Sequence, residues 1–294
     1  MENSKYPALF QATDKGSIDA QSTYLLLIKV EFVCLISAAV FSSIQISWQA
    51  WLTAFYAISA ISLFIALIAR LIAKFGGFED KWFNCRAIAE SVKSVTWRYM
   101  MRVEPYEGDP KSKEVDKEFL KDIREIRDNQ LRGAKEAGRY TVSGDDITEH
   151  MREIRSESFQ DRLTYYNEER VEDQKKWYSK KAETKEDNGS NWFWFSLFVE
   201  AVAVILAFLW IIVPSSPVHP IGFLPTIAAV IISWTQVKKY KEVSQLYSLT
   251  VQDLRQVKST FIHVNSKDEF SDYVEDVENI ISKEHTVWLA KRRK

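Results

Sequence analysis

Long apolar runs alternate with densely charged stretches along this chain. The four apolar runs are Tyr24–Ile46, Trp51–Ala69, Trp192–Val213 and Ile221–Val237. A run of about 20 mostly apolar residues is long enough to cross a bilayer as a helix. The second and third runs are apolar on nearly all faces, whereas a helix in a soluble core would be shorter and amphipathic. The pattern predicts an all-α membrane protein with four transmembrane helices in two hairpins, the fourth helix being the shortest.

The residues that flank the runs indicate an orientation. The connectors Ser42–Ala50 and Pro214–Pro220 carry no formal charge, whereas the other flanks are rich in Lys and Arg. Because Lys and Arg stay on the cytoplasmic side of the membrane, we expect both termini and the long middle segment in the cytoplasm. The expected location is multi-pass in the inner (plasma) membrane. Tryptophans near the predicted borders fit aromatic anchors.

The charged segments show helical periodicity. Lys111–Arg132 and Tyr240–His263 each place apolar residues on one face, with a cap at Ser143 predicted for the helix that follows the first. The last segment repeats the pattern with spacings of 4, 3, 4 and 7, at Phe270, Val274, Val277, Ile281 and Trp288. Such faces need partners, which are each other or neighbouring subunits. We therefore take this last stripe as the candidate assembly face.

We expect three sequential parts. Residues 1–106 would form the first hairpin with its cytoplasmic helices, 107–160 a charged helical connector, and 161–294 the second hairpin with the C-terminal helices. Asn188–Ser190 would form a turn just before the third apolar run.

Acidic residues interrupt two of the apolar runs. Glu31 lies 8 residues after Thr23, and Glu200 lies 8 residues after Trp192. A charge that far into the bilayer costs at least about 2.5 kcal/mol, so each should face a bundle interior or water. One reading is an ion path or proton-sensitive gate. The other is structural: a carboxyl group hydrogen-bonded across helices or paired with Lys29, although Lys29 and Glu31 point to different faces.

The two halves share a small-residue pattern around these acids. Glu31 is followed by Cys34 and Ala38, and Glu200 by Ala203 and Ala207, both at i, i+3 and i+7. Small residues allow close helix approach in membranes. A duplication explains the match, and so does chance.

Composition narrows the chemistry. The 294 residues contain 39 basic and 40 acidic side chains, so net charge gives no pull toward nucleic acid. Two cysteines without a C-x-x-C motif exclude a disulfide framework or zinc ribbon. Phosphate-loop, hydrolase and zinc-protease motifs are missing, so we expect no enzyme, no cofactor and no metal. Glu278, Glu284 and His285 on the last helix fit either a metal or acid/base group or a salt-bridged surface or subunit interface.

Four segments carry a family resemblance. Tyr6–Leu27, Arg86–Met101, Arg162–Ala182 and Phe270–Arg292 resemble parts of SLATT domains, the SMODS and SLOG-associating 2TM effectors, in two tandem units; Lys111–Arg155 is the least similar part. The resemblance implies a bacterial membrane effector of conflict systems that make or sense nucleotides. It also implies oligomerisation into a pore, or other membrane damage, when a signal arrives.

Two functions follow from this reading. The first is an oligomeric, non-enzymatic, pore-forming or ion-channel-like effector of antiviral (anti-phage) defence, with Glu31 and Glu200 as candidate lining and Lys29 beside them. Its partners would be the lipid bilayer, further copies of the chain, and a nucleotide second messenger or the protein that makes or senses it. The alternative is a membrane-anchored scaffold or sensor that binds a partner protein through its cytoplasmic helices.

Overall fold

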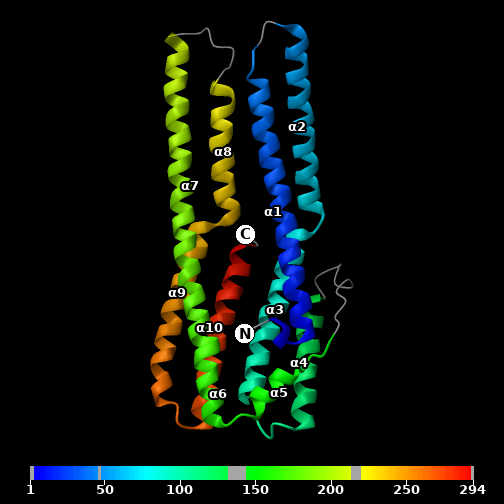
Figure 1. Ribbon diagram of the computed structural model, residues 1–294, viewed down its shortest axis with the longest axis vertical. Helices are drawn as coiled ribbons and strands as arrows, with labels where there is room; N and C mark the ends of the chain where they lie inside the picture. Colours follow the sequence, from blue (N-terminus) through cyan, green and yellow to red (C-terminus); the bar gives the residue numbers. More distant parts are fainter. Residues whose placement is uncertain (1–2, 46–47, 132–143, 213–219, 293–294) are drawn as a thin grey trace. The chain divides into compact units, whose positions relative to one another are not determined.

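The structure is a computed structural model, and it describes residues 3–45, 48–131, 144–212 and 220–292. The side chains of 130–131, 220–221 and 283–292 lie outside this description. The described chain is helical with short connections and contains no strand, which confirms the all-α class. Its α-helices are α1 (Ala8–Ser42), α2 (Gln49–Phe75), α3 (Phe78–Met101), α4 (Lys113–Leu131), α5 (Glu149–Ser156), α6 (Phe159–Tyr166), α7 (Asp173–Ile212), α8 (Pro220–Lys238), α9 (Tyr240–Thr260) and α10 (Lys267–Arg292) (Figure 1).

The helices form two compact units. The core unit comprises residues 1–21, 80–182 and 243–294, and the hairpin unit comprises residues 22–79 and 183–242. Two long helices, α1 and α7, contribute residues to both units. Each unit thus takes pieces from both halves of the chain, and we describe each by itself.

In the hairpin unit, α2 packs on α1. The Ser59 hydroxyl donates a hydrogen bond of 2.9 Å to the carbonyl of Ala38, and the rings of Phe41 and Phe55 stack with centroids 5.8 Å apart. Ala38 belongs to the small-residue stripe, so the stripe is where the second helix of this hairpin approaches α1.

The other face of the unit is built from α8 and α7. Trp234 of α8 meets the ring of Phe32 on α1 edge-on at 6.5 Å. A small cluster joins α7 to α8, with Val199, Ala228 and Ile231 at its centre. The contacts therefore run in the order α2, α1, α8, α7, and Figure 1 shows α2 and α7 at opposite edges of this unit.

The surface of the hairpin unit is apolar. Large side chains with at least 39% exposure follow α2 (Tyr56, Ile58, Ile61, Leu63, Phe64, Ile65, Leu67, Ile68, Leu71, Ile72, Phe75) and α7 (Phe193, Trp194, Phe195, Leu197, Phe198, Val204, Ile205, Phe208, Leu209, Ile211, Ile212). Exposed apolar area of this extent marks a surface that contacts a membrane or another protein. Three described stretches are long and apolar enough to cross a membrane, and they contain α1, α2 and α7. A fourth crossing by α8 stays a prediction.

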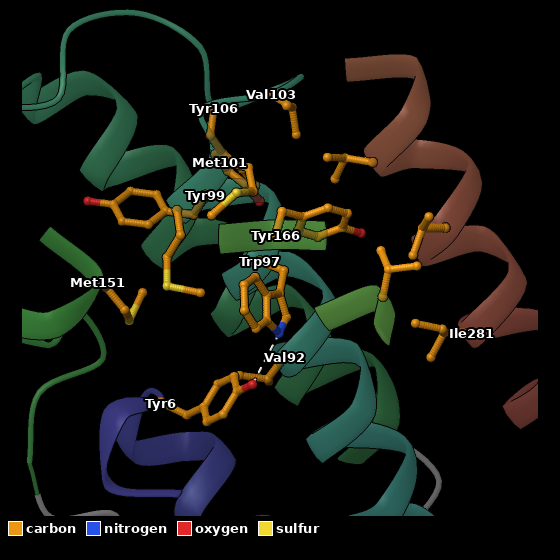
Figure 2. Packing of buried hydrophobic residues seen from close by; sticks show 14 of the residues in the cluster. Tyr6, Val92, Trp97, Tyr99, Met101, Val103, Tyr106, Met151, Tyr166 and Ile281 are labelled. Atoms are coloured by element: carbon orange, nitrogen blue, oxygen red, sulfur yellow. Dashed lines mark hydrogen bonds between the residues drawn. The ribbon is translucent and has the colours of Figure 1, made fainter. Parts of the chain in front are cut away.

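The core unit buries a continuous aromatic and aliphatic cluster. Trp97, Tyr99 and Met101 of α3 are fully buried, and Tyr166 of α6 packs edge-on against Trp97 with ring centroids 5.7 Å apart. Figure 2 shows Trp97 between Tyr166 and Tyr6, with its indole N–H donating to the Tyr6 hydroxyl at 3.1 Å. The cluster joins segments far apart in the sequence, so this unit has an ordinary protein core.

The structure differs from the sequence-based expectation at one turn, and an expected cap lies outside it. The turn expected at Asn188–Ser190 is wrong, because α7 continues through it. Gly189 serves close packing instead: a Cβ added there would lie 3.1 Å from the Cβ of Tyr240. The expected cap residue Ser143 lies outside the described residues, and the hydroxyl of Thr148 caps α5 by accepting from the amide of Met151.

Candidate functional site

An ion pair lies inside the first hairpin. Glu31 of α1 is 5% exposed, and Nη1 of Arg70 on α2 donates to its Oε1 at 2.8 Å. The Arg70 side chain is 74% exposed. The sequence reading missed this partner, because Arg70 directly follows the second apolar run and reads as a border residue. The sequence did place Arg70 one residue beyond the run, close enough to the membrane segment to be considered as a partner of Glu31.

Lys29 lies beside an aromatic ring, although from the sequence it was considered as a partner of Glu31. It is exposed, and its Nζ lies 5.8 Å from the centroid of the Trp234 ring. Lys238 lies over the same ring at 4.9 Å. A cation over an indole face is stabilised by the ring quadrupole. The two lysines and Trp234 thus form a cation–π cluster near the end of α8.

Glu200 does not repeat the environment of Glu31. Its neighbour Val199 is buried against α8, whereas Glu200 itself is exposed on α7. Among the described residues, its carboxylate has no ion pair or hydrogen bond. The matched spacing of the two halves therefore leads to one covered and one uncovered acid, on different helices of one unit.

A second ion pair is sealed in the core unit. Nε and Nη2 of Arg170 donate to the two carboxylate oxygens of Glu278 at 2.9 and 2.7 Å, and the hydroxyl of Tyr166 donates to Oε1 at 3.0 Å. Burial lowers the pKa of Arg170, but the attraction and hydrogen bonds of Glu278 outweigh it and raise that pKa overall. Burial and the neighbouring carboxylate both raise the pKa of the Tyr166 hydroxyl.

Glu278 forms a salt bridge, but inside the core and not on a surface or subunit interface as one reading expected. Its side chain is 0% exposed and fully occupied by Arg170 and Tyr166, so it belongs to a buried structural pair and not to a surface cluster. The side chains of Glu284 and His285 lie outside the described residues. Within the described part of the chain, no three His, Cys, Asp or Glu side chains come together to hold a metal.

Two more arginines close the end of α3. Nη1 of Arg155 donates to the carbonyl of Tyr99, and Nε of Arg162 donates to the carbonyl of Met101 at 3.2 Å. The last carbonyls of a helix lack intrahelical partners, and cations near them are favoured by the helix dipole. Burial and the charges of Arg102 and Arg155 lower the pKa of Arg162 to about 10. These arginines cap a helix inside the core.

The candidate assembly face also lies in this core. Phe270, Val274, Val277 and Ile281 are at most 4% exposed and pack in the cluster of the core unit. Of the two partners expected for the stripe, the structure shows the chain's own helices. Trp288, its last member, lies outside the described side chains.

Comparison with known families covers nearly the whole chain. Residues 7–163 match the model of SMODS and SLOG-associating 2TM effector domain 3, and residues 166–288 match the model of domain 1 of the same series. No curated protein and no solved structure matches the chain. The tandem arrangement expected from the sequence is confirmed by the two adjoining matches.

Proposed function

Since the chain belongs to the SMODS and SLOG-associating 2TM effector family, with two such domains in tandem, we propose that it assembles in the inner membrane and permeabilises it on a signal. Domains of this family are effectors associated with bacterial conflict systems. The protein would act without catalysis, as the terminal step of an anti-phage response. Its ligands would be lipid, further copies of the chain, and a nucleotide second messenger or the protein that makes or senses it.

The ion pair inside the hairpin unit carries this proposal. A segment that serves only as a membrane anchor does not need charged residues among its apolar helices, because each charge raises the free-energy cost of membrane insertion. Glu31 is nevertheless buried there and held by Arg70 at 2.8 Å. Intramembrane ionisable side chains commonly face the helix bundle and mark ion or proton paths. A pair with one buried and one exposed member can exchange partners when the helices rearrange.

The core unit supplies the complementary part. It holds the amphipathic helices α4, α9 and α10, and its apolar stripes are already covered within the chain. We place this unit in the cytoplasm, where it would receive the trigger. α1 and α7 run without interruption from the core unit into the hairpin unit. A change in the packing of either helix would therefore be transmitted along a continuous helix to the membrane.

The function is tested by membrane potential. High expression of the full chain in bacteria favours assembly by mass action without the natural trigger, and a potential-sensitive dye should report depolarisation. Glu31→Ala should alter the onset or extent of the loss. Glu186→Gln, an exposed acid on α7 beyond the apolar run, is the matched control. A normal potential in cells with the protein abundant in the membrane would refute the proposal.

The scaffold alternative makes different predictions. It places function on an exposed cytoplasmic face and assigns nothing to intramembrane charges. The stripe best suited to such a face, Phe270 to Ile281, is buried in the chain's own core. A functional Glu31→Ala chain with an unchanged potential profile would favour the scaffold.

A further inference from the structure

We infer that copies of this chain contact one another head to tail in the membrane, with α7 of one copy against α2 of the next and Glu200 paired with Arg70. This inference rests on the proposed assembly and specifies its interface. The occupant of both helix faces is therefore a second copy of the chain.

The two helices are the free edges of the hairpin unit. Contacts run from α2 through α1 and α8 to α7, and no described residue of α2 shares a hydrogen bond, ion pair or ring contact with α7. Figure 1 shows the two helices on opposite sides of the unit. A contact between different edges is heterologous, and such contacts close into rings when the rotation permits.

Each edge carries one exposed charge of opposite sign. Glu200 is exposed on α7 among large apolar side chains, including Phe193, Leu197 and Val204. The Arg70 side chain on α2 is 74% exposed, and only its Nη1 is used on Glu31. A guanidinium has five N–H donors in a planar fork, so it can hold two carboxylates. A single copy in lipid would leave the Glu200 carboxylate facing hydrocarbon without a cation beside it, which the head-to-tail contact avoids.

The backbones of Glu200 and Arg70 lie at different depths, with Glu200 nearer the outer loops. α8 is the common reference, because Phe32 meets Trp234 and Val199 meets Ala228 and Ile231. These positions differ by 3 to 6 residues along α8, or about 5–9 Å at 1.5 Å per residue, so Glu200 lies nearer the outer loops than Glu31. Arg70 lies on the other side of Glu31. It follows Ser59 by 11 residues, whereas Glu31 precedes Ala38, which accepts from Ser59, by 7 residues, and this difference adds about 6 Å to the gap.

Side-chain direction reduces this gap. Side chains lean toward the N-terminus of their own helix, and α2 and α7 run in opposite directions across the membrane in the proposed topology. The carboxylate of Glu200 therefore leans toward the cytoplasm, while the longer Arg70 side chain leans away from it. The two groups approach each other across the segment that lies between their backbones.

Cysteine cross-linking tests the contact on the full chain in native membranes. Leu67 lies one turn outward from Arg70, and Leu197 lies one turn inward from Glu200, so the two should face each other between copies. After Cys34→Ala and Cys85→Ala, the combination Leu67→Cys with Leu197→Cys should give a ladder of oxidised multimers. Each single cysteine should give no dimer, because the contact is not symmetric.

Control variants test separately whether the contact depends on the face of α2 and on the charge of Glu200. Ile68→Cys with Leu197→Cys keeps the depth but turns the α2 cysteine to another face, and it should give no ladder. Glu200→Arg in the cross-linking chain should reduce the ladder about tenfold or more, since two guanidinium groups would then meet in a low-dielectric setting. Glu186→Gln should leave the ladder unchanged.

The outcomes distinguish the contact from the proposed function. A missing Leu67–Leu197 ladder, or dimers from either single cysteine, overturns the head-to-tail contact, and depolarisation in the same cells would show that the function stands without it. A ladder lost with Glu200→Arg but kept with Glu186→Gln supports the contact, even where the membrane potential stays normal and the pore proposal fails.

Discussion

The core unit and the hairpin unit place similar side chains in opposite ways. Trp97, Tyr166 and Phe270 of the core unit are at most 1% exposed, whereas Phe64, Phe198 and similar residues of the hairpin unit are more than 60% exposed. A water-facing unit must bury such groups. A lipid-facing unit gains nothing from burying them, because lipid tails are as apolar as the side chains. The contrast supports the proposal that the hairpin unit contacts lipid and the core unit contacts water.

The two ion pairs show the same contrast at a smaller scale. Arg170 and Glu278 are 1% and 0% exposed, and every carboxylate oxygen has a donor. The side chains of Arg70 and Glu31 are 74% and 6% exposed, and one N–H contact joins them. The first pair is closed and structural. In the second, the exposed Arg70 side chain keeps N–H donors that a rearrangement or a neighbouring copy can reach, whereas Nη1 of Arg170, which has no acceptor, is buried.

Breaking the sealed pair should have the largest effect. Glu278→Gln leaves Arg170 charged without its counter-ion in the core and should lower the free energy of unfolding by about 3–5 kcal/mol. Thermal unfolding of detergent-solubilised protein, followed by tryptophan fluorescence, measures the loss. Glu275→Gln on the exposed side of α10 is the control. Equal stability of both variants would show that the pair is not closed as described.

Breaking the open pair should cost less. Arg70→Leu leaves Glu31 unpaired among apolar helices and should destabilise the chain by about 2 kcal/mol. Adding Glu31→Gln should recover most of the loss, because the uncompensated charge is then gone. Lys74→Leu, an exposed cation one turn further along α2, controls for removal of a positive charge. A double variant no better than Arg70→Leu would argue against a direct pair.

Close packing at Gly189 predicts a smaller, size-dependent effect. Gly189→Leu should destabilise by about 1.5 kcal/mol through overpacking against Tyr240. Gly189→Ala should be nearly neutral, because the gain in helix propensity of about 1 kcal/mol offsets the tight 3.1 Å approach. Ser190→Leu, exposed on the next position, should change little. Melting temperatures of the three variants test the order.

Acid should weaken the core unit slightly through His150. Burial, and then the positive charge of Lys5, lowers the pKa of His150 below its ordinary value of 6.5. The unfolded chain therefore binds the proton first, so stability present above pH 6.5 is lost as pH falls through the lower folded pKa. The melting temperature should fall less between pH 7.5 and 5.5 in His150→Gln than in the parent chain. Parallel profiles would contradict this assignment.

The helices were well predicted from the sequence, because the spacing of apolar residues is enough to indicate a helix and its buried face. The stripe from Phe270 to Ile281 and the helix α4 lie where their apolar repeats place them. The turn expected at Asn188–Ser190 was wrong because it was inferred from these three residue types alone. Gly189 lies instead within a helix, where it leaves room for Tyr240, a residue far along the chain.

The surroundings of Glu31 and Glu200 were only partly predictable, again because they depend on contacts between helices. The burial of Glu31 follows from the cost of a charge in an apolar run, but its partner Arg70 depends on how two helices are shifted along each other. Glu200 has the same sequence context as Glu31 and the opposite exposure. Which face of a helix meets a neighbour is a tertiary property that a symmetric spacing does not contain.

The central claim is that the hairpin unit lies in lipid, and fractionation tests it most directly. Cells expressing the full chain are broken, and the membranes are washed with alkaline carbonate and then with detergent. We predict that the chain stays in the membrane pellet through the carbonate wash and is released only by detergent. Recovery of the chain in the carbonate supernatant, or as a compact particle in plain buffer, would contradict the account.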